Sequence, residues 1–219
     1  MVKAGASRFA AEYGLTLVAP DTSPRNTGIA GEDDAYDLGT GASFYVDATV
    51  EPWRSHYQMY SYIVDELPAL IGEHFPVQTQ NQGIFGHSMG GHGALICALK
   101  NRDRYKSVSA FAPITAPTRC PWGQKAFTNY LGLDRESWSA YDASILVQTA
   151  GYNRSILIDQ GSADPYLGEQ LLPEVFQQAC ATANQPLTLR FHEGYNHSYF
   201  FINTLIEDHI RHHADALYG

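Results

Sequence analysis

The stretch that decides the fold is IFGHSMGGHGALICALK, residues 84–100. A short apolar run leads into GHSMG (residues 86–90), a Gly-x-Ser-x-Gly motif, and an Ala- and Leu-rich segment of helical composition follows at once. This order predicts a strand, a tight turn and a helix, with flanking glycines that avoid side-chain clashes at the turn. Ser88 is therefore predicted to be a nucleophile that attacks a carbonyl carbon, and the N–H of Met89 to hold the resulting oxyanion.

Two other interpretations of this motif are weaker. Ser88 could serve only as the N-cap of a glycine-rich helix start, but the strand before the motif and the helix after it favour a nucleophile. A phosphate-binding loop is disfavoured because no Gly-Lys-Ser/Thr follows, and the first predicted strand-to-helix turn lacks Gly-x-Gly-x-x-Gly.

Around this motif the sequence alternates short β-rich runs with longer segments of helical period, as is typical of a parallel sheet with crossover helices. Most of the runs are continuously apolar, which indicates strands covered by helices on both faces. The fold class is therefore predicted to be α/β with a mostly parallel sheet. The predicted strands are residues 15–19, 83–86, 107–112, 155–159 and 187–191.

Apolar stripes predict helices at residues 59–71, 171–180 and 201–210. Pro68 is expected to kink or restart the first of these helices. Residues 22–52 have neither period and are rich in Gly, Asp and Glu, which predicts a long ordered loop. Loops of this length are often functional, but a surface excursion without chemistry is an equally good interpretation.

Composition limits the class of protein. The 219 residues are 44% hydrophobic and 17% charged, which suits one packed domain, residues 1–219. A net charge of −9 without a basic face argues against nucleic acid and anionic membranes as partners. No stretch is long and apolar enough for a membrane span or a signal segment, so a soluble, cytoplasmic protein is expected. The three cysteines are expected to be reduced thiols.

A nucleophilic serine needs an acid and a histidine, which in this fold follow it in the order acid, then base. Asp164 is the predicted acid because it is the first carboxylate beyond the strand at 155–159. Asp159 is its rival, but it still lies in the strand, where its side chain would face helix or sheet. The sequence thus favours Asp164.

His197 is the predicted base because it lies in the loop between the last strand and the final helix. His192 ends that strand and is less favoured. His209, His212 and His213 could suggest a metal site, but no partner has a recognisable ligand spacing, so a solvated helix face is the preferred interpretation. His87 and His92, which flank the nucleophile, receive no triad role because neither follows the acid.

Six runs, in this order, resemble the S-formylglutathione hydrolases, also called esterase D, and the similarity extends over nearly the whole chain. They are APDTSPR (19–25), GHSMGGHGAL (86–95), SAFAP (109–113), CPWG (120–123), LIDQG (157–161) and EGYNHSY (193–199).

The resemblance implies an α/β-hydrolase fold and hydrolysis of S-formylglutathione, a small-molecule substrate, to glutathione and formate in formaldehyde detoxification. It implies no metal and no cofactor, and it places Ser88, Asp164 and His197 on the family's nucleophile, acid and base. A homodimer is a candidate assembly. A general short-chain carboxylesterase or acyltransferase is the alternative activity, since a triad does not fix the leaving group.

Family members begin with further strands before the helix that here includes residues 6–13. One of those strands ends in a Ser-Gly-Leu-type loop that supplies the second oxyanion donor. The chain as written is therefore expected to be N-terminally incomplete, with a gap in the sheet between the strands at 15–19 and 83–86. Besides the two enzyme activities, a third expectation is thus that the chain is an inactive or poorly folded fragment. An upstream segment would then restore its folding and activity.

The groups that would bind glutathione are not identified by the sequence. The tripeptide is anionic and the chain is acidic, so local cations or backbone N–H groups are needed. Arg25 is one candidate, and an equally good interpretation is a structural salt bridge.

Overall fold

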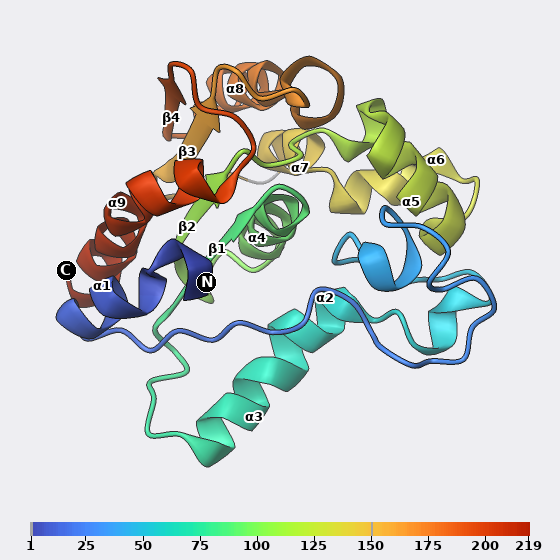
Figure 1. The fold of residues 1–219 in the computed structure, drawn as a ribbon, viewed down its shortest axis with the longest axis horizontal. Coiled ribbons are helices and arrows are strands. Elements are labelled where there is room, and N and C mark those ends of the chain that lie inside the picture. The colour runs from blue at the N-terminus through green and yellow to red at the C-terminus, as the bar shows by residue number, and fades with distance from the viewer. Residues whose placement is uncertain (1, 150) are drawn as a thin grey trace.

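The central feature of the fold is a four-stranded parallel sheet, seen in a computed structural model that describes residues 2–149 and 151–219. The strands lie in the order β1-β2-β3-β4, which is also their order along the chain (Figure 1). They are β1 (Gln82–His87), β2 (Tyr105–Phe111), β3 (Ile156–Gly161) and β4 (Leu187–His192). Each begins within two residues of a predicted strand, which confirms four of the five predicted strands and the parallel sheet.

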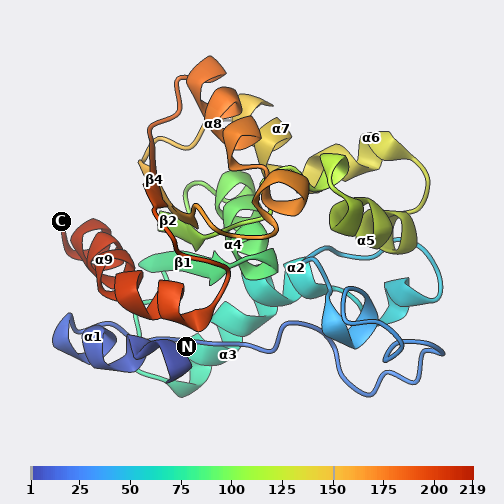
Figure 2. The same ribbon diagram turned by 45° about the horizontal axis from the view of Figure 1, so that its top comes forward.

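Helices cover both faces of the sheet, as predicted. In Figure 1, α4, α7 and α8 lie on one face and α9 on the other, and Figure 2 shows α1 alongside α9. The helices are α1 (Ala6–Glu12), α2 (Met59–Ser61), α3 (Leu67–His74), α4 (Met89–Lys100), α5 (Pro121–Leu131), α6 (Arg135–Trp138), α7 (Ala143–Thr149), α8 (Pro173–Thr182) and α9 (Tyr199–Tyr218). Short 3-10 turns lie at Val2–Ala4, Gly39–Gly41, Trp53–Ser55, Pro117–Arg119 and Ser139–Tyr141.

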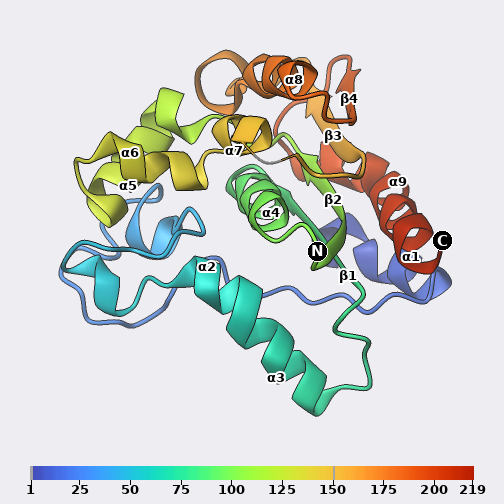
Figure 3. The ribbon, with the colours of Figure 1, turned by 180° about the vertical axis from the view of Figure 1, so that it is seen from behind.

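The predicted strand at residues 15–19 is wrong. This segment carries no strand assignment and instead runs in an irregular course from α1 past α3 (Figure 3). An apolar run becomes a strand only where a neighbouring strand supplies hydrogen-bond partners. Among the described residues β1 pairs only with β2 and forms one edge of the sheet, so residues 15–19 have no strand beside them.

Pro68 restarts the helix predicted at residues 59–71, as expected. Helix α2 passes into a π turn at Tyr62–Glu66, and α3 then begins with Pro68 in its first turn. Proline has no N–H to donate to the preceding turn, and a π turn is a common way to absorb such an interruption.

The long loop at residues 22–52 is partly a core element. Phe44, Val46 and Ala48 are buried at alternate positions, and Phe44 packs on Phe127 of α5 with ring centroids 6.2 Å apart. The interpretation as a bare surface excursion therefore fails for this part of the loop. Its contribution to stability comes from the apolar area it removes from water.

Three cysteines, Cys97, Cys120 and Cys180, are buried and free, as predicted. None of the described helices is long and apolar enough to cross a membrane. Among the described residues no group of three or more His, Cys, Asp or Glu side chains is placed to hold a metal ion.

The prediction of a solvated face for the α9 histidines is wrong for two of them. His209 and His213 are buried against the sheet, and His213 bridges Ser107 and Ser109 with nitrogen–oxygen distances of 2.6 and 2.9 Å. His209 joins Ser109 at 2.8 Å and Asp159 at 3.0 Å. These two residues lie on the face of α9 that packs against the sheet. Polar side chains of β2 and β3 supply their hydrogen-bond partners there.

This buried network makes stability depend on pH. Burial lowers the pKa of His209, although Asp159 opposes the shift, and burial lowers the pKa of His213 well below its ordinary value. Below about pH 6.5 the unfolded chain binds more protons than the folded chain. The contribution of these histidines to the free energy of unfolding is therefore fully present above that pH and is lost as the pH falls. We expect a decline of up to about 1.4 kcal/mol per pH unit for each histidine.

Thermal melts between about pH 7.5 and pH 5.5 measure this decline. His213→Gln should reduce the slope of Tm against pH, because one titrating group is lost. The exposed His56 provides the control, and His56→Gln should leave the slope unchanged. An equal slope in the wild type and His213→Gln would contradict the assignment.

Candidate active site

Ser88 occupies a strained turn between β1 and α4, as the motif predicts. Its backbone has φ 57° and ψ −117°, a conformation that residues with a side chain rarely adopt. The Ser88 N–H donates to the Phe111 carbonyl at 2.9 Å, and the Ser88 carbonyl accepts from His92 N–H at 3.0 Å. These bonds to β2 and to the first turn of α4 hold the strained residue in place.

The two glycines of the motif are not equivalent. A Cβ at Gly86 would lie 2.1 Å from the Gly90 carbonyl oxygen, so only glycine fits there. A Cβ at Gly90 would meet nothing nearer than the Tyr45 Oη, at 3.9 Å. The expectation that both glycines prevent clashes is therefore correct for Gly86 and wrong for Gly90.

We expect Gly86→Ala to unfold the turn or the protein and Gly90→Ala to be tolerated. The first change forces backbone against backbone, and overpacking of this kind costs about 1 to 3 kcal/mol or more. The second adds a methyl group where space exists and replaces a helical glycine, which should be neutral or slightly stabilising. Tm values of the two variants test this, and equal losses would contradict the difference between the two positions.

Met89 is the first residue of α4. The first N–H groups of an α-helix have no intrahelical acceptor, and they lie at the positive end of the helix dipole. An N–H in this place, directly after Ser88, is available to an oxyanion formed on a carbonyl bound to the serine.

Asp164 and His197 form a hydrogen-bonded pair. The His197 Nδ1 lies 2.6 Å from the Asp164 Oδ2, and the Asp164 side chain is fully buried whereas His197 keeps 16% of its side chain exposed. Asp164 follows β3, and its other oxygen accepts from the Tyr166 N–H at 2.9 Å. Burial by itself would raise the pKa of Asp164, but the hydrogen bonds from His197 and Tyr166 outweigh it and lower that pKa.

His197 lies beside the strand end that carries Ser88. Its ring centroid is 4.3 Å from that of His87, the residue before Ser88. Among the hydrogen bonds of the described residues, none joins the Ser88 hydroxyl to His197. Such bonds are often long in unliganded sites and shorten when substrate is present.

The rival candidates Asp159 and His192 belong to a different cluster. Asp159 is fully buried in β3 and accepts from Arg190 through both of its oxygens, from His192 at 2.9 Å and from His209 at 3.0 Å. Burial opposes its ionisation, but the bonds from His209, Arg190 and His192 lower the pKa of Asp159. All its acceptor positions are occupied by structural partners.

An aromatic cluster beside His197 was not predicted. Tyr166 packs edge-on to the His197 ring, with ring centroids 5.2 Å apart, and the ring centroid of Trp122 lies 4.8 Å from that of Tyr166. The Trp122 Nε1 donates to the hydroxyl of the exposed Tyr36 at 3.2 Å. The three residues lie in separate segments of the chain and share no periodicity, so no sequence signal could group them.

Arg25 forms a structural salt bridge, which was the second of its two interpretations from the sequence. It forms a salt bridge to Asp21 at 2.5 Å and donates to the Thr40 carbonyl at 2.5 Å, which ties the start of the long loop to its middle.

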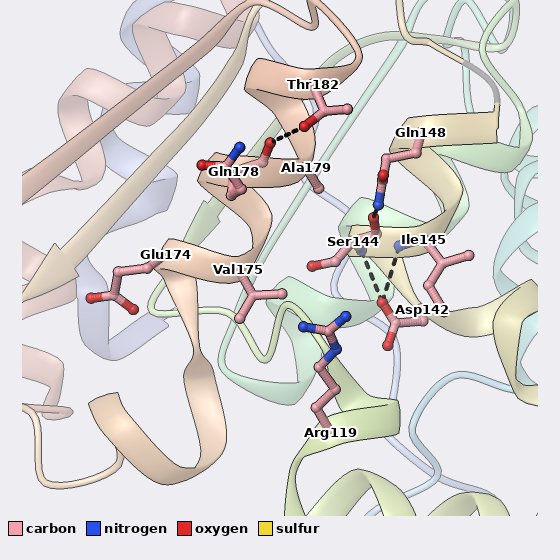
Figure 4. A pocket seen from close by; sticks show the side chains of 10 residues that line it. All are labelled: Arg119, Asp142, Ser144, Ile145, Gln148, Glu174, Val175, Gln178, Ala179 and Thr182. Carbon is pink, nitrogen blue, oxygen red and sulfur yellow. Dashed lines mark hydrogen bonds between the residues drawn. The ribbon is translucent and has the colours of Figure 1, made fainter.

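An open groove of about 450 Å³ lies away from these residues, between α7 and α8 (Figure 4). Figure 4 shows Asp142 at one side of it, accepting from the N–H groups of Ser144 and Ile145. None of the predicted site residues lines this groove. The groove is therefore not part of the candidate active site.

Comparisons with known proteins agree on one family. The Esterase family, described as "Putative esterase", matches residues 1–212. The S-formylglutathione hydrolase of Rattus norvegicus is 58% identical over 98% of this chain and 77% of its own length, and that of Arabidopsis thaliana is 56% identical over 99% and 77%. A solved S-formylglutathione hydrolase from Agrobacterium tumefaciens superposes with a TM-score of 0.94 at 51% identity, over 98% of this chain and 78% of that one.

Proposed function

Because the chain belongs to the S-formylglutathione hydrolase family of esterases, we propose that it hydrolyses the thioester S-formylglutathione to glutathione and formate. The observation that carries the proposal is the Asp164–His197 pair, at 2.6 Å, beside the strained turn of Ser88. A serine, a histidine and a buried carboxylate in this order form the constellation used for acyl transfer.

In the first step the Ser88 Oγ attacks the formyl carbon while His197 takes the hydroxyl proton. The carbonyl oxygen becomes an oxyanion, and the Met89 N–H donates a hydrogen bond to it. The carbon–sulfur bond then breaks, His197 returns the proton to the sulfur, and glutathione leaves. Formyl-Ser88 remains.

In the second step a water molecule attacks formyl-Ser88 and gives its proton to His197. The second oxyanion collapses, the Ser88 oxygen takes the proton back, and formic acid is released and loses its remaining proton to solvent to give formate. Asp164 holds the His197 tautomer whose Nδ1 carries the proton, so that the other nitrogen is free to accept. The lowered pKa of Asp164 keeps it ionised at neutral pH. Neither step requires a metal or a cofactor.

The experiment is a comparison of kcat/KM for S-formylglutathione with that for simple aryl esters, together with labelling by a fluorophosphonate probe. Labelling with preference for the thioester supports the proposal. Labelling with preference for aryl esters would make the chain a general short-chain carboxylesterase or acyltransferase. A chain that neither turns over substrate nor reacts with the probe would lack an assembled triad and would contradict the proposal.

We further propose that residues 1–219 form one α/β-hydrolase domain that acts in the cytoplasm. Support comes from the two buried clusters that share the sheet and from the three free cysteines. A homodimer is the assembly to test, by light scattering of the purified chain; nucleic acid and membranes are not proposed as partners.

A further inference from the structure

His87 has a place in the site that the triad does not use. It ends β1, directly before Ser88, and its ring lies against that of His197 with centroids 4.3 Å apart and an interplanar angle of 41°. On another side, Tyr166 meets the same His197 ring edge-on, at 5.2 Å and 83°. Asp164 holds the Nδ1 of His197. The imidazole of His197 is thus in contact with one hydrogen-bond partner and two aromatic rings.

The Nε2 of His87 is buried and makes no structural hydrogen bond to the described residues. Burial, and then the neighbouring His197, lower the pKa of His87 to about 3, so its ring is neutral at physiological pH. A neutral ring does not repel the imidazolium that forms on His197 during acyl transfer.

We propose that His87 is a positioning residue, whose ring packs against His197 and holds that imidazole in line with Ser88. The inference rests on the proposed function, because it assumes that His197 acts on Ser88. A single hydrogen bond to Asp164 fixes the place of Nδ1 but still lets the His197 ring tilt through its side-chain torsions χ1 and χ2. Contact with a ring fixed on β1 removes that freedom, and misplacement by about 1 Å can cost on the order of 10² in rate.

Three substitutions separate the ring from its nitrogens. His87→Phe keeps a ring without nitrogen, His87→Gln keeps an amide nitrogen without a ring, and His87→Ala removes both. If the ring positions His197, kcat should fall by about 10- to 100-fold in the Gln and Ala variants with KM little changed, and Phe should restore most of it. The rate of fluorophosphonate labelling should follow the same order.

His92 is the matched control. It is also buried and its Nδ1 also lacks a partner among the described residues, but it packs on Phe44 and Phe127 instead of His197. His92→Ala keeps the backbone N–H that bonds to the Ser88 carbonyl and loses only the side-chain Nε2 bond to the Phe44 carbonyl. It should therefore lower Tm without lowering the labelling rate per folded molecule.

A readout without turnover keeps this inference separate from the proposed function. The short His197–Asp164 hydrogen bond should give a downfield proton signal in NMR, which sharpens when the ring is held. We expect the signal in the wild type and His87→Phe, and its broadening or loss in His87→Gln and His87→Ala.

If the wild type does not cleave S-formylglutathione but the signal and the labelling rate follow the ring, the substrate proposal fails and the positioning role stands. A Gln variant as good as the wild type would overturn the positioning role, even if the Phe variant failed to fold. Variants that all behave like the wild type would also overturn it.

Discussion

Replacing Ser88 with alanine is expected to lower kcat for hydrolysis of S-formylglutathione by on the order of 10⁶, which leaves only a small residual rate from the oxyanion hole and substrate binding. The serine hydroxyl is the only group removed, and in the proposed mechanism its oxygen carries the formyl group of the covalent intermediate. Fluorophosphonate labelling should disappear with it. Steady-state hydrolysis and probe labelling of purified wild type and Ser88→Ala measure the effect.

The fold should survive this change. Alanine and serine both carry a Cβ, so both meet the same strain at φ 57°, and the backbone bonds of Ser88 to Phe111 and His92 remain. Equal Tm values for the two proteins provide the control. A kcat within about 10²-fold of the wild type in a folded Ser88→Ala variant would show that another residue is the nucleophile.

Replacing Asp164 with asparagine is expected to lower kcat by about 10⁴. The amide still fits the space, but its NH₂ group favours the wrong tautomer of His197, with the proton on the nitrogen that should accept from Ser88. The Tyr166 N–H can still donate to the remaining amide oxygen, so the loop should keep its shape. Hydrolysis rates at saturating substrate, with circular dichroism to check the fold, measure this effect.

Asp159→Asn is the matched comparison, and it should act on stability instead of chemistry. Asp159 is fully buried and pairs with Arg190 at 2.5 Å, but the Arg190 side chain keeps 35% of its surface exposed. The loss in stability should therefore be smaller than the roughly 3 to 5 kcal/mol that is typical of a fully buried ion pair. We expect a clear fall in Tm with rates per folded molecule close to wild type. The reverse pattern, with the large rate loss at Asp159, would make Asp159 the acid.

Local sequence determined the parts of the protein that depend on neighbours along the chain. The motif at residues 86–90 needs only a strand, a tight turn and a helix, and the strain at Ser88 and the lack of space at Gly86 follow from that local geometry. Chain order placed Asp164 and His197 in loops after successive strands. Carboxyl ends of parallel strands meet at one edge of a sheet, so these two loops come together, and the 2.6 Å pair agrees with that expectation.

Tertiary structure decided what depends on partners distant in sequence. Residues 15–19 have the composition of a strand, but a strand exists only where another one lies beside it, and none does among the described residues. His209 and His213 were expected on a solvated helix face because no ligand spacing accompanies them in the sequence. In the fold, Ser107, Ser109 and Asp159 supply buried hydrogen-bond partners that offset the cost of burying these two rings. The contact of His87 with His197 joins two segments more than a hundred residues apart, and only packing in three dimensions brings such rings together.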